Sequence, residues 1–268
     1  MQTLNEAFTR YRLEVLPTLG ERTQKDYARH LTVLERTFGH LEPNALKPIY
    51  VGAFLDRPKG KIQANRQVAV LSAVYAKLVG RWYQADRNPC IGVERNPSHP
   101  RTRYVTDGEF EAMRTVCSHS LKLAMDLALL TGQRQGDLIA LQFKNVSDEG
   151  IYFQQGKTGK KLLVAMSPAL TEVIERSRRQ EPLGPTVIRT RKGNAYTSEG
   201  FRAMWQRACQ RATKRSVLDV RFRFHDIRAK TVSDSTTLEE AFARAGHTSM
   251  TITRSVYDRG VRKVTPLK

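Results

Sequence analysis

The segment from residue 84 to residue 106, QADRNPCIGVERNPSHPRTRYVT, most limits how this chain can fold. It holds Pro89, Pro97 and Pro100, and its apolar residues follow neither a helical nor a strand period. Proline lacks the backbone donor that helices and sheets need, and it disfavours helical geometry in the residue before it. We therefore expect a linker here and two separately folded domains, residues 1–99 and residues 100–268.

Apolar residues on both sides of this linker recur at spacings of three and four, which is the period of an amphipathic helix. In the first domain the pattern predicts helices over residues 4–16, 23–38 and 63–83, separated by breaks that contain proline or glycine. The helices predicted in the second domain cover residues 107–117, 120–132, 135–142, 168–180, 198–213, 225–235, 238–246 and 250–257.

Three local signals refine the second domain. Thr106 followed by Glu109 is a capping-box signature. Ser167 and Pro168 combine an N-cap residue with proline at the first helical position. Residues 150–166, GIYFQQGKTGKKLLVAM, form two β-like runs around a turn rich in glycine and lysine, which predicts a hairpin with a basic tip. The predicted fold is therefore mainly α with a small antiparallel sheet.

The balance of charge is the first sign of a binding partner. The 268 residues include 45 Lys and Arg against 26 Asp and Glu, for a formal net charge of +19. Such a field attracts polyanions, either nucleic acid or an anionic membrane surface. The longest apolar runs are short and interrupted by charge, and the N-terminus lacks a signal-peptide pattern. We therefore expect a nucleic-acid-binding protein of the cytoplasm, with no membrane partner.

Several familiar catalytic motifs are missing from the sequence. There is no HExxH or Cys/His cluster for a metal, no GxxxxGK[ST] phosphate loop and no GxSxG nucleophile elbow. Cys90, Cys117 and Cys209 are far apart, so they indicate neither a disulfide framework nor a zinc ribbon. We expect neither a metal nor another cofactor.

What remains is a series of cationic and polar residues near turns and helix ends. Each alone fits an ordinary role, such as a surface ion pair, a solvated lysine, a capping histidine or a core tyrosine. His225 and Arg228 are three apart in FHDIRAK, so a helix would turn both toward one side. The series comes from TGQRQGD, QGKTGKK, HDIR, AGHTS and RSVYDRG, and consists of Arg134, Lys157, His225, Arg228, His247 and Tyr257.

In this order the motifs resemble the catalytic domain of tyrosine recombinases, the phage-integrase family, and among these the lambda-type phage integrases. The resemblance covers residues 103–260 and extends more weakly into ANRQVAVLSAVYAKLVGRWYQADRNPC, which is similar to the core-binding domain of the family. It implies a helical, SAM-like core-binding domain over residues 1–99 and an α+β catalytic domain over residues 100–268. Together the two domains would form a C-shaped clamp on duplex DNA.

The chemistry of a phosphodiester explains the two arginines. Attack on the phosphate builds charge on its non-bridging oxygens, and a guanidinium offers paired donors and stays charged at any working pH. The resemblance implies that Arg134 and Arg228 hold the scissile phosphate in the role that metals play in many nucleases. Asp137 is expected to orient Arg134 as its i,i+3 partner. Asp226 is expected to turn outward near the N-terminus of its helix.

The remaining residues would carry the covalent step and the proton transfers. A tyrosine hydroxyl, with a pKa of about 10, is a poor nucleophile without assistance. The resemblance implies that Tyr257 forms a 3′-phosphotyrosine and that Lys157 is the general acid for the leaving 5′ oxygen. His225 would assist as an acid or base, and His247 would donate a hydrogen bond to the phosphate. The phosphotyrosine preserves the phosphoester energy, so rejoining would need no ATP.

The resemblance also implies the partners of the protein. It would bind double-stranded DNA at recombination or attachment sites, as a monomer in solution and a homo-tetramer on DNA, and exchange strands through a Holliday junction. Accessory DNA-bending proteins are candidate partners, and the nucleoid of a bacterial host is the expected location. Further DNA contacts are expected from the basic residues Lys59, Lys61, Arg66, Lys160 and Lys161.

Two other functions also fit the sequence. A type IB topoisomerase uses a similar set of residues to make a 3′-phosphotyrosine, although the HDIR and GHTS forms favour a recombinase. A non-catalytic protein could keep the DNA clamp without the chemistry. The sequence also leaves open an additional N-terminal domain that binds arm sites, and docking of residues 258–268 on a neighbouring protomer.

Overall fold

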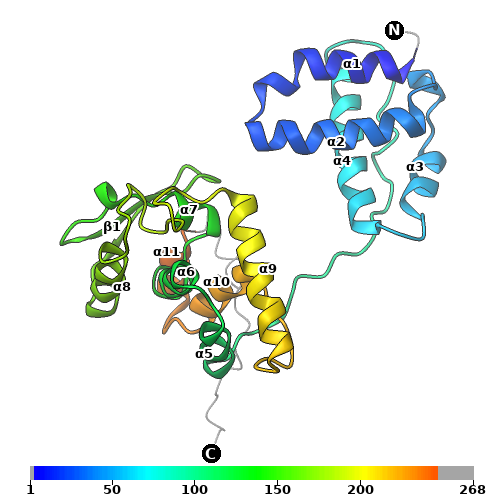
Figure 1. Cartoon of the computed structure of the whole chain (residues 1–268). Helices are drawn as coiled ribbons and strands as arrows, with labels where there is room; N and C mark the ends of the chain where they lie inside the picture. The colour runs from blue at the N-terminus through cyan, green and yellow to red at the C-terminus, as the bar shows by residue number, and fades with distance from the viewer. Residues whose placement is uncertain (1–2, 247–268) are drawn as a thin grey trace, which may run out of the picture. The chain divides into compact units, whose positions relative to one another are not determined.

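The computed structural model of the chain describes residues 3–246 and divides into two compact units, Met1–His99 and Pro100–Lys268 (Figure 1). We call them unit 1 and unit 2. Each has its own hydrophobic core. Residues 93–106, at the junction, form neither helix nor strand. No helix in the described part of the chain is long and apolar enough to span a membrane.

Unit 1 is helical. Its helices are α1 (Leu4–Glu14), α2 (Glu21–Phe38), α3 (Pro48–Leu55) and α4 (Lys61–Gly80). Helices α1 and α2 lie side by side, and α4 packs against both (Figure 1). Phe8, Leu31 and Leu71 are fully buried between them. The buried Tyr75 donates its hydroxyl proton to the carbonyl of Pro43 at 2.8 Å, so this polar group is satisfied inside the core.

Three of these helices were predicted, and α3 was not. Its sequence, PIYVGAFL, has almost no polar residue, so it shows no amphipathic period. The helix is defined instead by Pro48 at its first position, where a missing backbone N–H costs nothing. It packs on α4 through Val51 and Leu55, which are buried.

Unit 2 combines helices with one hairpin, as predicted. Its elements are α5 (Asp107–Thr115), α6 (His119–Thr131), α7 (Gln135–Ala140), β1 (Gly150–Gln154), β2 (Lys161–Ala165), α8 (Pro168–Arg178), α9 (Ser198–Lys214), α10 (Phe224–Ser233) and α11 (Leu238–Ala245). Strands β1 and β2 are antiparallel, with Gly150 opposite Ala165 and Gln154 opposite Lys161. The predicted fold class, mainly α with a small antiparallel sheet, is confirmed. The helix predicted over residues 250–257 lies outside the described residues.

The predicted helix starts are also confirmed. The backbone N–H of Glu109 donates to Thr106 Oγ1 at 3.2 Å, and the N–H of Thr106 donates to Glu109 Oε2 at 2.9 Å. This reciprocal capping box begins α5. Ser167 Oγ accepts from the N–H of Leu170 at 3.3 Å and begins α8.

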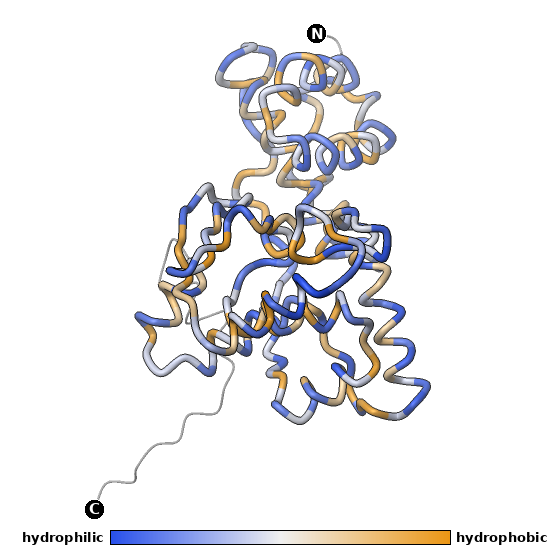
Figure 2. The backbone as a smooth tube through the Cα atoms, turned by 60° about the vertical axis from the view of Figure 1, so that its left-hand side comes forward, coloured by the Kyte–Doolittle hydropathy of each residue, from blue (hydrophilic) through white to orange (hydrophobic). Residues whose placement is uncertain are grey.

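Helix α6 is the centre of unit 2, because it packs against α7, α8 and α10. Its buried residues lie on more than one face of the helix, so α6 is covered by other elements on most sides. Figure 2 shows hydrophobic and hydrophilic residues alternating along most of the other helices, as expected for helices with one exposed face. The region around the end of α6 is therefore a rigid place on which to build a site.

An aromatic group fixes the start of α10. Phe222 and Phe224 are buried on either side of the exposed Arg223. The Phe224 ring meets Phe201 and Trp205 of α9 edge to face, with centroids 4.9 Å and 5.4 Å away. Edge-to-face pairs at these separations are favourable beyond their buried area. They hold the first turn of the helix that carries His225 and Arg228.

Candidate active site

The corner between α6 and α7 positions Arg134. Gly132 ends α6 with φ +65°, a left-handed geometry that glycine adopts without steric cost. Arg134 is then the N-cap residue of α7 and is half-buried. Its Nη1 donates to the side-chain Oε1 of Gln155 at 2.7 Å. The chain thus turns sharply at Gly132 and presents the guanidinium beside the hairpin.

Helix α10 holds Arg228 in the interior. The side chain is 1% exposed, and its two terminal nitrogens donate to the carbonyls of Gly132, at 2.5 Å, and Ala245, at 2.6 Å. Bonds from a cation to backbone carbonyls satisfy a charge that would otherwise be costly to bury. His225, one turn earlier, is exposed. Arg228 therefore joins the ends of α6 and α11.

The expectation for Asp226 is wrong, because its side chain is buried and not turned outward. It is 2% exposed, and its Oδ2 accepts from the backbone N–H of Arg223 at 2.8 Å and from Arg101 Nη2 at 3.0 Å. Arg223 is the N-cap residue of α10, and backbone donors at the start of a helix lack partners inside it. The carboxylate caps α10 and ties it to the segment before α5.

Asp137 also has a partner that differs from the expected one. Its Oδ1 accepts from the backbone N–H of Gly156 at 2.8 Å, whereas Arg134 donates to Gln155. Asp137 thus holds the turn that carries Lys157, not the arginine three residues before it. Its supporting role in the site stays a prediction, now through the turn. Lys157 itself is exposed in the loop between β1 and β2.

Two glutamines that the sequence analysis did not single out lie at the centre of the site. Gln133 and Gln155 are 1% and 0% exposed. Gln155 Nε2 donates to Gln133 Oε1 at 2.8 Å and to the carbonyl of Ala245 at 3.1 Å. Gln133 Nε2 donates to the carbonyls of Thr131, at 3.0 Å, and Arg244, at 2.9 Å. The one sequence signal for them is their position beside Arg134 and Lys157.

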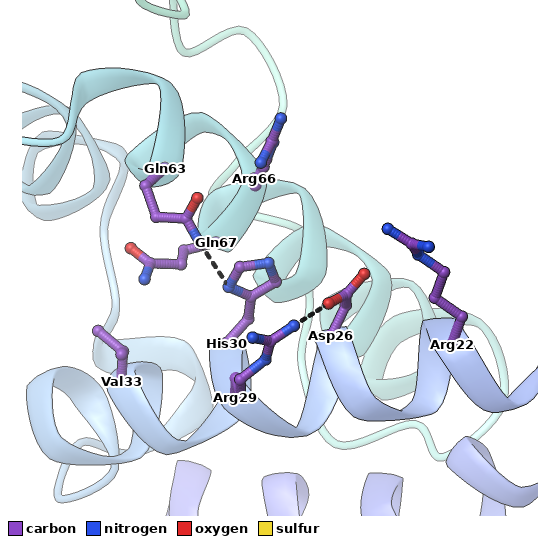
Figure 3. Close-up of a pocket in the computed structure, with 8 residues that line it drawn as sticks. All are labelled: Arg22, Asp26, Arg29, His30, Val33, Gln63, Arg66 and Gln67. Carbon is purple, nitrogen blue, oxygen red and sulfur yellow. Dashed lines mark hydrogen bonds and ion pairs between the residues drawn. The ribbon is translucent and has the colours of Figure 1, made fainter. Parts of the chain in front are cut away.

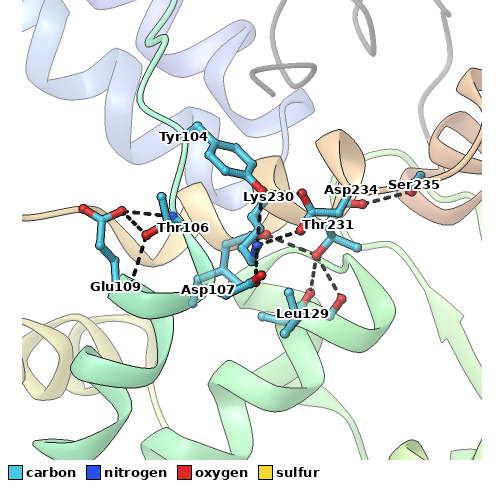
Figure 4. Close-up of polar contacts among 11 residues, drawn as sticks. Tyr104, Thr106, Asp107, Glu109, Leu129, Lys230, Thr231, Asp234 and Ser235 are labelled. Carbon is cyan, nitrogen blue, oxygen red and sulfur yellow. Dashed lines mark hydrogen bonds and ion pairs between the residues drawn. The ribbon is translucent and has the colours of Figure 1, made fainter. Parts of the chain in front are cut away.

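A buried lysine anchors α10 on the side of α5 (Figure 4). Lys230 is 1% exposed, and its ammonium makes ion pairs of 2.7 Å with both Asp107 and Asp234 and a 3.3 Å hydrogen bond to the Tyr104 hydroxyl. Burial lowers the pKa of Lys230, but its bonds to Asp107, Asp234 and Tyr104 outweigh burial and raise it. The neighbouring Thr231 donates to the carbonyl of Leu129 in α6 at 2.9 Å. Both contacts fix the helix that carries Arg228.

Unit 1 holds a separate polar pocket between α2 and α4, of about 580 Å³ (Figure 3). Gln63 Nε2 donates to His30 Nδ1 at 3.4 Å. Burial lowers the pKa of His30; Asp26 opposes this, and Arg29 and Arg66 lower it further. The residues that line the pocket are Arg22, Asp26, Arg29, His30, Val33, Gln63, Arg66 and Gln67.

The structure places the other predicted residues as follows. Lys59, Lys61 and Arg66 lie in unit 1 and are exposed, and Arg66 lines the polar pocket. In unit 2, Lys161 is exposed at the start of β2, and the ammonium of Lys160 lies 5.1 Å from the centre of the Phe242 ring. His247 and Tyr257 lie outside the described residues. Within residues 3–246 no cluster of His, Cys, Asp and Glu could hold a metal.

Comparison with known proteins gives consistent matches. The profile of the phage integrase family matches residues 103–260, more than half of the chain. The integrase of Escherichia phage HK022 is 25% identical over 192 residues, which cover 62% of this chain and 54% of that protein. The integrase of Escherichia phage lambda is 31% identical over 104 residues, 30% of this chain and 29% of that protein. The chain therefore spans about half the length, or less, of these curated relatives.

Solved structures show the same fold. A lambda integrase dimer bound to a COC′ core site has a TM-score of 0.83 with 22% identity, covering 99% of this chain and 80% of that one. A lambda integrase tetramer bound to a Holliday junction gives the same values. The Tn1549 transposon integrase in complex with circular intermediate DNA has a TM-score of 0.77 with 15% identity, covering 97% of each chain.

Proposed function

Because this chain belongs to the phage integrase family, we propose that it is a site-specific DNA recombinase that cleaves and rejoins DNA through a 3′-phosphotyrosine on Tyr257. One observation carries the proposal. Arg228 Nη2 and Gln155 Nε2 donate to the same carbonyl, that of Ala245, and Gln155 also accepts from Arg134. Two arginines nearly a hundred residues apart in sequence thus belong to one hydrogen-bonded group, which supports the binding of one phosphate by both.

The two arginines supply the electrostatic part of the reaction. Their buried or half-buried positions lower the local dielectric, so each guanidinium interacts more strongly with a phosphate than it would in water. The backbone carbonyls that hold Arg228 fix its direction before substrate arrives. This preorganisation stabilises the charge that develops on the non-bridging oxygens during attack.

Proton transfer falls to groups at the edge of the site. Lys157 lies on the exposed loop between the strands and protonates the leaving 5′ oxygen. His225 is exposed in the first turn of α10 and assists the attacking tyrosine. His247 and Tyr257 complete the set from outside the described residues, as hydrogen-bond donor and nucleophile.

Both basic units bind the same DNA duplex. The polar pocket of unit 1 supports this, because Arg22, Arg29 and Arg66 surround His30, whose pKa is lowered by burial. Lys59 and Lys61 at the start of α4, together with Lys160 and Lys161 in the hairpin, extend the positive surface. Such contacts neutralise phosphates without reading sequence.

Assembly follows the same reasoning. One of the similar structures is a tetramer bound to a Holliday junction. By analogy, four copies of this chain assemble on two DNA sites and exchange strands through such a junction, with DNA-bending proteins as accessory partners. The protein acts on DNA in the nucleoid of a bacterial cell.

The test begins with duplexes selected from a random-sequence pool by binding to the protein. A selected duplex is nicked so that the released strand end is lost and the covalent complex accumulates. The wild-type chain should remain attached to DNA on a denaturing gel, and Tyr257→Phe should bind equally well yet form no attachment. Joining of two separate duplexes is then assayed. Relaxation of supercoils without any joining would refute the recombinase and favour a topoisomerase.

A further inference from the structure

Gln155 has every polar atom of its side chain in use. Its Oε1 accepts from Arg134 Nη1, at 2.7 Å, and from Thr158 Oγ1, at 2.9 Å. Its Nε2 donates to Gln133 Oε1, at 2.8 Å, and to the carbonyl of Ala245, at 3.1 Å. The side chain is fully buried, so water cannot replace any of these partners.

These four bonds join three separate segments of unit 2. Arg134 lies at the start of α7, Thr158 in the loop that carries Lys157, and Ala245 at the end of α11, two residues before His247. The backbone of Gln155 adds to the loop, because its carbonyl accepts from the N–H of Gly159 at 2.8 Å. Gln155 is therefore linked to the segments that carry Arg134, Lys157 and His247. It is also linked to Arg228, because Arg228 donates to the same Ala245 carbonyl.

Only an amide fits this position. A carboxylate could accept from Arg134 and Thr158 but could not donate to the Ala245 carbonyl, and an apolar side chain could do neither. The surroundings also match its size, since a Cβ added to Gly246 would lie 2.6 Å from Gln155 Nε2. Gly246 has φ +59° as well, so backbone geometry and close approach both select glycine beside the amide.

Within residues 3–246, Gln155 is the only side chain that accepts a hydrogen bond from the Arg134 guanidinium. A single bond at Nη1 fixes the plane of the guanidinium and leaves its other N–H groups for a ligand. We propose that Gln155 is a positioning residue of the reaction: it aims Arg134 at the scissile phosphate and keeps the Lys157 loop and the end of α11 in register with it. This inference rests on the proposed recombinase function.

The test compares variants of the full chain under single-turnover conditions on the nicked duplex. Gln155→Met keeps the length of the side chain and removes all four bonds. We expect its cleavage rate to fall by about 100-fold, the cost typical of a misplacement of about 1 Å in a reacting group. Its DNA affinity should equal that of the wild type, because a single arginine is redirected and no basic residue is lost.

Two further variants separate positioning from general loss of structure. Ser177→Ala removes a buried hydroxyl that donates to the carbonyl of Val187 at 2.6 Å, among groups that hold α8 and are not in the site. It should lower the melting temperature while leaving cleavage unchanged. Gln155→Glu keeps the two acceptor bonds and places a carboxylate beside the Arg134 guanidinium. Because a carboxylate cannot donate to Gln133 or to the Ala245 carbonyl, the cleavage rate of this variant should also fall, while its DNA affinity stays close to that of the wild type.

The outcomes are distinct. If the wild-type chain forms no covalent complex on any selected duplex, the proposed function fails and the inference fails with it. If the wild type cleaves and Gln155→Met cleaves at the same rate, the positioning role alone is refuted. If Gln155→Met does not fold, Gln155→Glu decides: a cleavage rate equal to that of the wild type overturns the inference, and a lower rate at unchanged DNA affinity supports it.

Discussion

Removing the Asp226 carboxylate should destabilise unit 2 by about 2 kcal/mol. In Asp226→Ala, the N–H of Arg223 loses its cap, which costs about 1 kcal/mol for a helix N-terminus. The bond to Arg101 adds about 1 kcal/mol, a value reduced from that of a buried charged hydrogen bond because the Arg101 side chain is 38% exposed. For a unit of this size the loss corresponds to a melting temperature lower by about 4–8 °C.

The two tryptophans allow unit 2 to be followed by itself. Trp82 lies in unit 1, and Trp205 in unit 2 contacts Phe224 at the start of α10. In a Trp82→Phe background, urea denaturation monitored by fluorescence therefore reports the region that Asp226 caps. Asp226→Asn should lose about 1 kcal/mol, because one amide oxygen can still accept from Arg223 while the charge facing Arg101 is gone.

An exposed aspartate provides the matched control. Asp148 lies on the surface before β1, so Asp148→Ala should change the stability by no more than about 0.5 kcal/mol. If Asp226→Ala unfolds at the same urea concentration as this control, the carboxylate does not cap α10 and the energetic reasoning is wrong.

Four further results are expected. Arg134→Lys should cleave far more slowly than wild type at equal DNA affinity, since a point charge cannot reproduce paired donors; a normal single-turnover rate would argue against its role. DNA affinity measured against salt should fall steeply as counterions are released, and a flat response would contradict the phosphate contacts. Lys230→Met should cost about 1 kcal/mol or less by urea denaturation, although Lys230 is buried, because its carboxylate partners Asp107 and Asp234 are 92% and 39% exposed and both return to water; a loss of several kcal/mol would contradict this. Burial raises the pKa of Cys90 and Cys117 to about 12; it also raises the pKa of Cys209, but this thiol is only half-buried, so iodoacetamide at neutral pH should modify Cys209 first, as read by peptide mass spectrometry.

The sequence predicted those parts of the fold that depend on near neighbours in the chain. The capping box at Thr106, the glycine end of α6 and the Ser167–Pro168 start each involve residues within four positions of one another. The hairpin is equally local, because its two strands flank one short loop. Signals of this kind are complete in the sequence, so tertiary packing had little to override.

Apart from helix α3, whose apolar sequence shows no amphipathic period, the errors and omissions concern partners that are distant in the chain. Asp226 was expected outside because an acidic residue in a first helical turn is usually solvated, but Arg101 approaches it from 125 positions away. Gln155 is polar and lies in a loop, which predicts exposure, yet contacts from α7 and α11 bury it. Sequence order predicts which residues carry the chemistry, but it could not indicate which residues hold them in place.

The alternation of Phe222, Arg223 and Phe224 has a consequence for changes in chain length. The buried rings fix the rotation of α10 about its own axis, and each helical residue advances that rotation by about 100°. One residue inserted between Phe224 and Arg228 would swing the arginine away from the carbonyls of Gly132 and Ala245. The exposed stretch over residues 219–220, before the aromatic pair, lies outside both α9 and α10 and does not set the rotation of α10. Insertions and deletions should therefore be tolerated in that stretch and rejected a few residues later.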